Sequence, residues 1–433
     1  MKKYIFLALF VVFGENMMAQ SKLRSQIDVL ADKGEAQVIA WRRDFHQFPE
    51  LSNREFKTAE KIANHLRKLG LEVQTGIANT GVVGILKGDK AGPVVALRAD
   101  IDALPLVERV PVAFASKEKA VYNGQEVGVM HACGHDSHTA MLLGAAEVLV
   151  SLKKDLKGTV KFIFQPCEEG APEGEEGGAK LMIEQGVLKN PNAEVIFGLH
   201  INSGIEVGQI KYKPQGIMAA ADRFQIKVNG KGTHGSTPWT GIDPIVAAAQ
   251  IINGIQTIVS RQVALTDDPA VVTVGAINGG VRNNIIPEEV SMIGTIRTFN
   301  EAMQQKIHEK LVLTAQKIAE SMGASAEVKI TRQYPVTYNH EQLTADMLPT
   351  LQAAAGKENV SLTKAWTGAE DFSFYQKQIP GLFFFLGGMA KGTDSNLAAP
   401  HHTPDFKLDE SGFKLGVKTL CYLTVDYMER KAK

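Results

Sequence analysis

The 433-residue sequence predicts an α/β protein: a layered domain with a largely parallel sheet, plus an inserted ferredoxin-like β-α-β-β-α-β domain. Two observations lead to this class. Short apolar segments alternate with longer ones whose apolar residues recur every three or four positions, which is typical of strands alternating with helices. Within residues 215–332 the expected order becomes β-α-β-β-α-β, the pattern of a split-βαβ unit.

The first domain is expected over 20–214 and, after the insertion, over 333–433. Ser52-Asn53-Arg54-Glu55 has the form of a helix capping box, and apolar spacing from Phe56 to Leu69 predicts the helix that follows. Strands are predicted at 82–86, 94–97, 160–164, 195–198 and 381–386. Further helices are predicted at 139–152, 178–184, 344–356 and 412–430.

The inserted domain is expected over 215–332. Its predicted strands are 223–228, 271–276, 290–297 and 326–330. Its predicted helices are 244–259 and 302–322.

The composition narrows the functional classes. Hydrophobic residues make up 44% and charged residues 22% of the chain, which is ordinary for a soluble globular enzyme. Lys plus Arg and Asp plus Glu both number 47, so no net field attracts nucleic acid or anionic lipid. Three cysteines do not form a disulfide framework.

The N-terminus has the layout of a secretory signal peptide over residues 1–19. Lys2 and Lys3 precede the apolar run 4–13, and Ala19 offers a small residue before a cleavage site at Gln20. Ten apolar residues are too few to span a bilayer. We therefore expect export, to a bacterial periplasm or beyond, without membrane insertion after the leader is removed. A buried first helix is the alternative.

The segment 131–138 concentrates metal-ligating side chains: His131, Cys133, His135, Asp136 and His138. Imidazole and thiolate suit zinc and its first-row neighbours, so the mixture indicates a transition-metal site. Because the predicted helix starts at residue 139, these ligands are expected just ahead of its N-terminus. The alternative is a loop of surface histidines beside a buried cysteine.

Polar side chains also follow three predicted strands where each ends: Asp100 and Asp102, Glu168 and Glu169, and His200. Open α/β sheets place their sites at the carboxyl ends of strands, so these residues are expected together. One carboxylate of an adjacent pair can bind metal while the other takes a proton from metal-bound water. The sequence alone does not say which glutamate has which role.

Two further histidine positions are weaker signals. His401 and His402 lie between two prolines and therefore in a loop, and His234 follows the first strand of the insertion on a glycine-rich bend. The pair at 401–402 could equally be an ordinary exposed turn, and a histidine placed like His234 is more often an ordinary loop residue. The chain carries neither a Gly-x-Ser-x-Gly nucleophile elbow nor a Walker phosphate loop, which disfavours those enzyme classes.

The segments LRADIDALP (97–105), HACGHD (131–136) and QPCEEG (165–170) resemble motifs of the metal-dependent amidohydrolases. This family includes hippurate hydrolases, N-acyl-amino-acid amidohydrolases and plant indoleacetyl-amino-acid hydrolases, within the aminoacylase and glutamate carboxypeptidase superfamily. The resemblance extends over about 36–426. One departure is Cys167, where relatives commonly carry alanine.

The resemblance implies two divalent metal ions per subunit (zinc, manganese, cobalt or nickel) and a role for each matching residue. The implied metal ligands are Cys133, His135, Glu169, His200 and His402. His402 fits the family's His-x-Pro-x-Phe pattern better than His401. Glu168 would be the general base, and Asp100 and Asp102 would orient the ligands.

In the inserted domain, the resemblance implies that His234 binds the substrate carbonyl, often across a homodimer interface. Asn284 and Arg297 match substrate-binding positions. The implied reaction is hydrolysis of the amide bond of small N-acyl amino acids, either hippurate-like or N-acetylated. A carboxypeptidase or dipeptidase using the same metals is the nearer alternative. A non-catalytic metal- or peptide-binding protein is disfavoured, because it would not require Glu168 beside Glu169.

Overall fold

The structure is a computed structural model that describes residues 2–431, with side chains from residue 22 onward. The predicted signal peptide, 1–19, therefore lies outside the described side chains. The chain divides into two compact units. Unit 1 comprises Met1–Gln215, Asn339–Thr363 and Phe374–Lys433, and unit 2 comprises Gly216–Tyr338 and Lys364–Ser373. The short second segment of unit 2 was not anticipated from the sequence.

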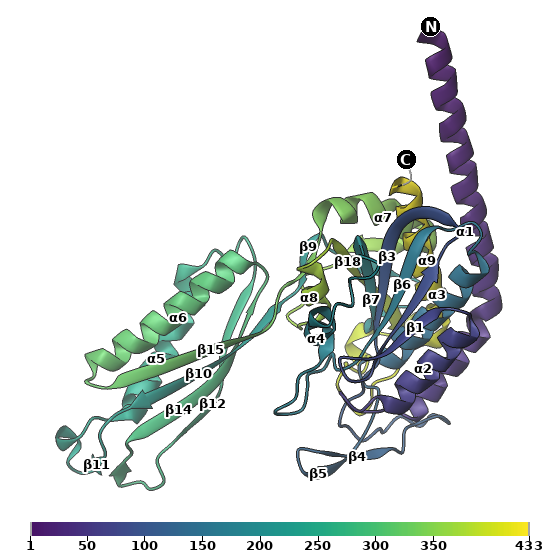
Figure 1. The fold of residues 1–433 in the computed structure, drawn as a ribbon. Coiled ribbons are helices and arrows are strands. Elements are labelled where there is room, and N and C mark those ends of the chain that lie inside the picture. Colours follow the sequence, from purple (N-terminus) through teal and green to yellow (C-terminus); the bar gives the residue numbers. More distant parts are fainter. Residues whose placement is uncertain (1, 432–433) are drawn as a thin grey trace. The chain divides into compact units, whose positions relative to one another are not determined.

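Unit 1 is built on an eight-stranded sheet (Figure 1). In spatial order its strands are β1 (Glu72–Ile77), β2 (Gly81–Lys87), β6 (Lys157–Gln165), β3 (Lys90–Asp100), β7 (Val195–Glu206), β18 (Gly381–Met389), β8 (Ile210–Tyr212) and β17 (Val360–Leu362). The central strands β6, β3, β7 and β18 run parallel, whereas β2 and β8 join them antiparallel. The predicted α/β class with a largely parallel sheet is confirmed.

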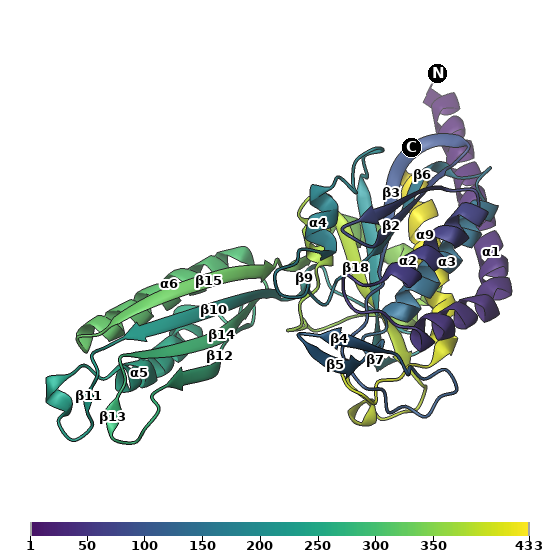
Figure 2. The same cartoon turned by 60° about the horizontal axis from the view of Figure 1, so that its bottom comes forward.

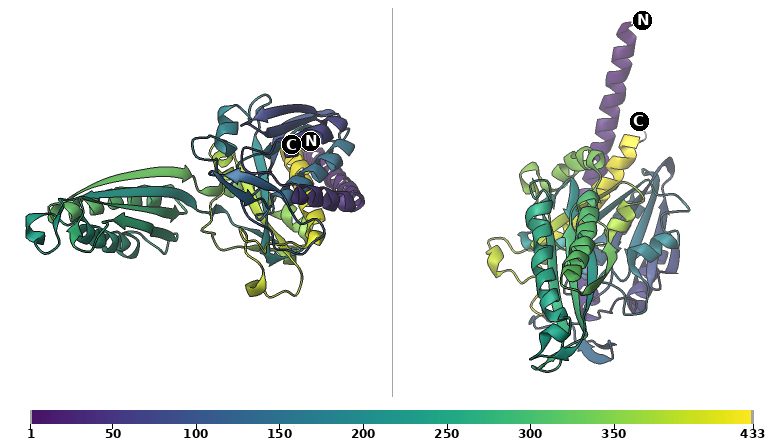
Figure 3. Two further views of the ribbon diagram at one scale, coloured as in Figure 1. Left: turned by 90° about the horizontal axis from the view of Figure 1, so that it is seen from below. Right: turned by 90° about the vertical axis from the view of Figure 1, so that its left-hand side faces the viewer.

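The helices of unit 1 build layers on this sheet. They are α1 (Lys2–Gln47), α2 (Phe56–Lys68), α3 (His135–Ser151), α4 (Gly178–Glu184), α7 (Glu341–Ala355), α8 (Phe372–Gln376, which crosses the unit boundary) and α9 (Phe413–Lys431). Helices α3 and α9 pack against β3, and α1 packs on both of them (Figure 3). The 3₁₀ turns are η3 (Lys357–Asn359), η4 (Ser395–Leu397) and η5 (Glu410–Gly412), and β4 (Lys119–Tyr122) pairs with β5 (Gln125–Gly128).

Two local expectations for unit 1 were wrong. Helix α3 begins at His135 instead of residue 139, after Gly134 at φ 96°, so that His135 lies inside the first turn and Cys133 just ahead of it. The capping box at 52–55 does not form: Glu55 is the N-cap residue of α2 and its side chain makes no capping hydrogen bond. Both differences concern residues that belong to the site described below.

Helix α1 continues past the predicted leader to Gln47, a helix that the sequence analysis did not expect. Five of its apolar residues are buried at helical spacing: Leu23, Ile27, Ala31, Val38 and Phe45. Among the described residues, no helix combines the length and apolar character needed to cross a membrane.

Unit 2 has the predicted ferredoxin-like order (Figure 2). Its main elements are β10 (Ala220–Asn229), α5 (Pro244–Thr257), β12 (Ala270–Gly279), β14 (Glu289–Thr298), α6 (Glu301–Ser321) and β15 (Ser325–Tyr334). The strands form an antiparallel sheet in the order β12-β14-β10-β15, packed on α5 and α6. Asp243 and Asn300 cap the two helices through their side chains.

Smaller elements complete unit 2 and its connections. They are β11 (Thr233–His234), η1 (Pro238–Thr240), the π-turn η2 (Ile258–Gln262) and β13 (Ile285–Ile286). The chain passes between the units within β9 (Gln215–Met218) and β16 (Thr337–Asn339).

Candidate metal centre

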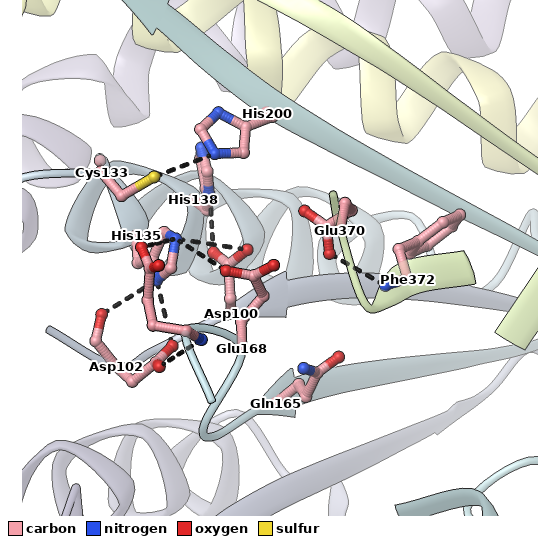
Figure 4. Close-up of polar contacts among 12 residues, drawn as sticks. Asp100, Asp102, Cys133, His135, His138, Gln165, Glu168, His200, Glu370 and Phe372 are labelled. Atoms are coloured by element: carbon pink, nitrogen blue, oxygen red, sulfur yellow. Dashed lines mark hydrogen bonds and ion pairs between the residues drawn. The ribbon is translucent and has the colours of Figure 1, made fainter. Parts of the chain in front are cut away.

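Unit 1 gathers the predicted ligands at the carboxyl edge of its parallel strands (Figure 4). Asp100 ends β3, and Glu168 and Glu169 follow the end of β6. His200 lies inside β7, because this strand continues to Glu206 and not only to residue 198 as predicted. The start of α3 contributes Cys133 and His135, and the loop before η5 contributes His402.

The side chains meet in one cluster. The Sγ atom of Cys133 lies 3.3 Å from Nε2 of His200 and 3.3 Å from Nε2 of His402. The Oε1 atom of Glu169 lies 3.1 Å from His402 Nε2 and 3.8 Å from His135 Nε2. Glu168 Oε2 lies 3.9 Å from the same nitrogen of His135. The structure thus brings together all five predicted ligands and the predicted base.

Hydrogen bonds to Nδ1 fix the ring orientation of two of the predicted histidine ligands. Nδ1 of His135 lies 2.9 Å from the carbonyl oxygen and 3.1 Å from Oδ1 of Asp102, so it donates there. Nδ1 of His200 lies 2.6 Å from the carbonyl oxygen of Ile201 and donates to it. With the proton on Nδ1, each ring turns the lone pair of Nε2 toward the cluster, as a metal ligand requires.

Two other histidines of the cluster use both ring nitrogens elsewhere. His138 lies with Nδ1 2.6 Å from Asp100 Oδ1, and its Nε2 accepts the Ile201 amide at 2.8 Å. His401 contacts the Cys133 carbonyl through Nδ1 at 3.2 Å and accepts the Ser203 amide on Nε2 at 3.2 Å. These bonds favour His402 over His401 as a ligand and give His138 a positioning role that the sequence analysis missed.

The aspartates at the end of β3 connect the cluster to the sheet. Asp100 accepts a hydrogen bond from Arg98 Nη1 at 2.7 Å, and Arg98 also donates from Nε to Gln165 at 2.9 Å. Asp102 Oδ2 accepts the hydroxyl of Ser52 at 2.8 Å and the amide of Glu169 at 3.0 Å. Asp102 therefore holds one ligand by its imidazole and a second by its backbone.

The electrostatics of the cluster fit a cation. Burial lowers the pKa of His135, but the charges and hydrogen bonds of Asp100 and Asp102 outweigh this and raise it to about 10. Burial, reinforced by the charges of Glu169 and Glu168, raises the pKa of the Cys133 thiol well above its usual value. A divalent cation would offset this excess of negative charge and favour the thiolate.

Two buried atoms support the same conclusion. His135 Nε2 and Glu169 Oε1 are among the buried polar atoms of the described chain that make no hydrogen bond. Unsatisfied buried polar atoms are costly unless an ion or water completes them. Thiolate, imidazole and carboxylate donors within 4.8 Å of one another form the set that transition metals prefer.

The structure also brings to the site residues that the sequence did not connect with it. Glu55, which is fully buried, accepts the amide of Cys167 on Oε1 at 2.9 Å and the hydroxyl of Thr80 on Oε2 at 2.6 Å. Burial, together with the charge of Asp102, raises the pKa of Glu55 to about 8. Cys167 is buried at φ 60°, and none of the three cysteines forms a disulfide. No sequence signal links residue 55 to residue 167, because the contact depends on the tertiary fold.

The predicted substrate-binding residues lie in unit 2, at two separate places. His234 is exposed in β11 and pairs with Ile285, next to Asn284, whose carbonyl accepts the amide of Gly235. Arg297 pairs with Ala221 at the start of β10, whereas His234 follows the end of that strand. Eight residues of strand separate Ala221 from Asn229, about 26 Å at the usual rise, so His234 and Arg297 lie at opposite ends of the sheet.

Comparison with known proteins finds a matching family and similar chains. The model of the family described as peptidase family M20/M25/M40 matches residues 96–426. A thermostable carboxypeptidase 2 of Saccharolobus solfataricus is 39% identical over 411 residues, covering 94% of this chain and 99% of that protein. An N-acetylcysteine deacetylase of Bacillus subtilis is 39% identical over 402 residues, covering 92% and 99% respectively.

A solved structure is also similar over most of the chain. The YXEP protein of Bacillus subtilis, titled a dinuclear metal-binding peptidase of the M20 family, superposes with a TM-score of 0.77 at 37% identity. The match covers 92% of this chain and 99% of that one.

Proposed function

Because this chain belongs to peptidase family M20/M25/M40 and is a metal-dependent hydrolase of amide bonds, we propose that it releases amino acids from small N-acyl amino acids. The observation that carries the proposal is the pair Glu168 and Glu169 beside a cluster of cysteine and histidine ligands. The relative named N-acetylcysteine deacetylase supports this substrate class over longer peptides.

We assign the ligands of two divalent ions as Cys133, His135, Glu169, His200 and His402. Each of the three histidines keeps Nε2 within reach of Cys133 or Glu169. Glu169 fits a ligand better than Glu168 because its Oε1 lies near two imidazoles, at 3.1 and 3.8 Å. Zinc, manganese, cobalt and nickel all suit this donor set, and availability often decides among them.

Glu168 acts as the general base. Its carboxylate takes a proton from the attacking water, whose oxygen forms a bond to the amide carbon, and then delivers that proton to the leaving nitrogen as the carbon–nitrogen bond breaks. The bound metals supply a water of lowered pKa and a Lewis acid for the carbonyl. Glu168 is buried at 6% exposure, which favours proton transfer with substrate over exchange with bulk water.

The remaining substrate contacts support a homodimer. An N-acyl amino acid is much shorter than the strand of about 26 Å between Arg297 and His234. If both residues bind one substrate, they must come from different subunits. We therefore propose that Arg297 holds the α-carboxylate and that His234 of a partner subunit contacts the carbonyl. Asn284 lies beside His234 and would reach the α-carboxylate only from that same partner subunit. Light scattering tests the dimer, and mixing inactive Glu168→Gln with inactive His234→Ala protein should restore activity if sites are shared.

A carboxypeptidase or dipeptidase activity is the second candidate, favoured by the similarity to a thermostable carboxypeptidase. The two reactions share the metal chemistry and differ in what fills the acyl pocket. We also propose export, with the leader 1–19 removed. Sequencing the N-terminus of the mature protein tests this, and a chain that still begins at Met1 in a secretion-competent host would contradict it.

The decisive experiment is hydrolysis of hippurate, several N-acetyl amino acids and a set of dipeptides by metal-reconstituted protein, with a chelator control. Chelator-sensitive release of free amino acid from the acyl substrates supports the proposal. Turnover of dipeptides alone favours the second candidate. Absence of turnover on the whole panel, with metal bound, would overturn both.

A further inference from the structure

The segment Ser52–Glu55 contacts the loops of the metal centre instead of capping α2. Ser52 donates its hydroxyl to Asp102, and Asn53 donates its side-chain amide to the Glu176 carbonyl at 3.1 Å. Arg54 donates to Glu175, and Glu55 accepts from Cys167 and Thr80. Four consecutive residues thus bind loops that follow β3, β6 and β1, and the proposed mechanism uses none of the four.

Glu55 and Asp102 each bind a residue next to Glu168 in the chain. Glu55 Oε1 accepts the backbone amide of Cys167 at 2.9 Å, and Asp102 Oδ2 accepts that of Glu169 at 3.0 Å. Buried carboxyl groups therefore accept hydrogen bonds from the backbone N–H groups of both residues adjacent to the base. Such a pair of bonds restricts rotation of the turn that carries the Glu168 side chain.

This turn needs an external support, because Cys167 adopts φ 60°. A left-handed conformation costs a residue with a Cβ atom about 1–2 kcal/mol, and it persists only where surrounding contacts impose it. Glu55 supplies such a contact, and Thr80 fixes the other oxygen of the same carboxyl group at 2.6 Å. Thr80 is itself buried beside β2, so the support is anchored in the sheet.

We propose that Glu55 is a positioning residue for hydrolysis, which holds the Cys167–Glu169 turn so that Glu168 faces the substrate water. The inference rests on the proposed role of Glu168 as general base. What Glu55 contributes is a fixed hydrogen-bond acceptor for the Cys167 amide. Its charge is dispensable, because a neutral carboxyl or carboxamide oxygen accepts the same bond and the Thr80 hydroxyl can reverse its direction.

Three substitutions separate these properties. Glu55→Leu removes both acceptors at similar volume, Glu55→Asp keeps the carboxyl group but shortens the reach, and Glu55→Gln keeps the reach without a titratable group. We expect kcat per metal-loaded site to fall about 10- to 100-fold in Glu55→Leu, with KM within about threefold and metal content unchanged. Glu55→Asp should fall less, and Glu55→Gln should keep kcat within about threefold of the unsubstituted protein. If Glu55→Leu does not fold, the kcat of Glu55→Asp compared with that of Glu55→Gln tests the proposal instead.

A second readout does not depend on turnover. Amide hydrogen exchange in the peptide that contains Cys167 should accelerate in Glu55→Leu and not in Glu55→Gln, also in metal-free protein. The matched control for general destabilisation is Leu351→Ala, in the core of α7 and remote in sequence from the site, which should lower Tm and leave kcat per folded site unchanged.

Three outcomes would overturn the proposal: an unchanged kcat in folded Glu55→Leu and Glu55→Asp, a loss in Glu55→Gln as large as in Glu55→Leu, or a loss confined to KM. The Glu168→Gln variant distinguishes this failure from failure of the proposed function. If Glu168→Gln is inactive while Glu55→Leu is fully active, only the positioning role is wrong. If Glu168→Gln retains normal turnover, the assignment of the base itself is wrong.

Discussion

Nδ1 of His135 donates to Asp102, whose Oδ1 lies 3.1 Å away and whose other oxygen accepts the amide of Glu169. One carboxylate thus orients two proposed ligands. We expect Asp102→Ala to weaken metal binding about 10- to 100-fold, since partners behind metal ligands typically contribute this much. Competition with a chromogenic chelator measures the affinity. Asp155→Asn, at an exposed ion pair with Lys90, is the control and should bind as the unsubstituted protein does. Equal affinities for both variants would contradict this role.

The two adjacent glutamates should separate binding from catalysis. Glu168→Gln is expected to keep its metals and lose about 10²- to 10⁴-fold in kcat, the usual contribution of a general base. Glu169→Gln should lose metal, because Glu169 Oε1 is a buried atom 3.1 Å from His402 Nε2. Metal analysis after dialysis and steady-state kinetics on the best substrate of the panel measure both effects. Near-normal turnover of metal-loaded Glu168→Gln would refute the assignment.

The histidine pair at 401–402 gives a third prediction. His401 has both ring nitrogens bonded to backbone groups, of Cys133 and Ser203, whereas Nε2 of His402 faces Cys133 and Glu169. We expect His402→Gln to lower metal stoichiometry and His401→Gln to leave it unchanged. Elemental analysis of the two purified variants provides the measurement. Loss of metal from His401→Gln alone would reverse the assignment.

Much of this site follows from local sequence. Proposed ligands that come shortly after a strand, such as Glu169, are found because the carboxyl ends of parallel strands meet at one edge. The spacing of Cys133 and His135 is also local, although the helix proved to begin at His135. The ferredoxin-like order of unit 2 follows from apolar periodicity in the same way.

What the sequence could not give depends on contacts between distant segments. Ser52 and Glu55 have the spacing of a capping box, but tertiary hydrogen bonds to Asp102 and Cys167 compete successfully for their side chains. The choice between His401 and His402 likewise depends on which ring nitrogens the backbone already occupies. The spacing of apolar residues along the chain contains no information on these tertiary contacts.

Glu55 should also give the fold a measurable pH dependence. Burial and the Asp102 charge raise its pKa from 4.5 to about 8 in the folded chain. Between these values the folded state holds a proton that the unfolded state releases, so the free energy of unfolding should fall as pH rises through this window. Glu55→Gln cannot titrate and should lose this part of the dependence. Urea unfolding of both metal-free proteins from pH 5 to 9 measures the difference, and parallel profiles would contradict the prediction.

Helix α3 is closely packed at Gly144, two to three turns beyond its start. Gly144 lies where α1 and α9 meet α3, and a Cβ atom there would lie 2.7 Å from a methyl of Val38 and 2.9 Å from one of Val417. Gly144→Val should therefore overpack this junction and lower the free energy of unfolding by about 1–3 kcal/mol. Adding Val38→Ala should recover part of the loss, because it removes the nearer of the two methyl contacts. Thermal or urea unfolding of the single and double variants tests this, and a double variant less stable than Gly144→Val would show that the clash is not the cause.

Since α3 begins at His135, the same pair of variants also tests whether this packing holds that proposed ligand in place, with metal affinity as the second readout.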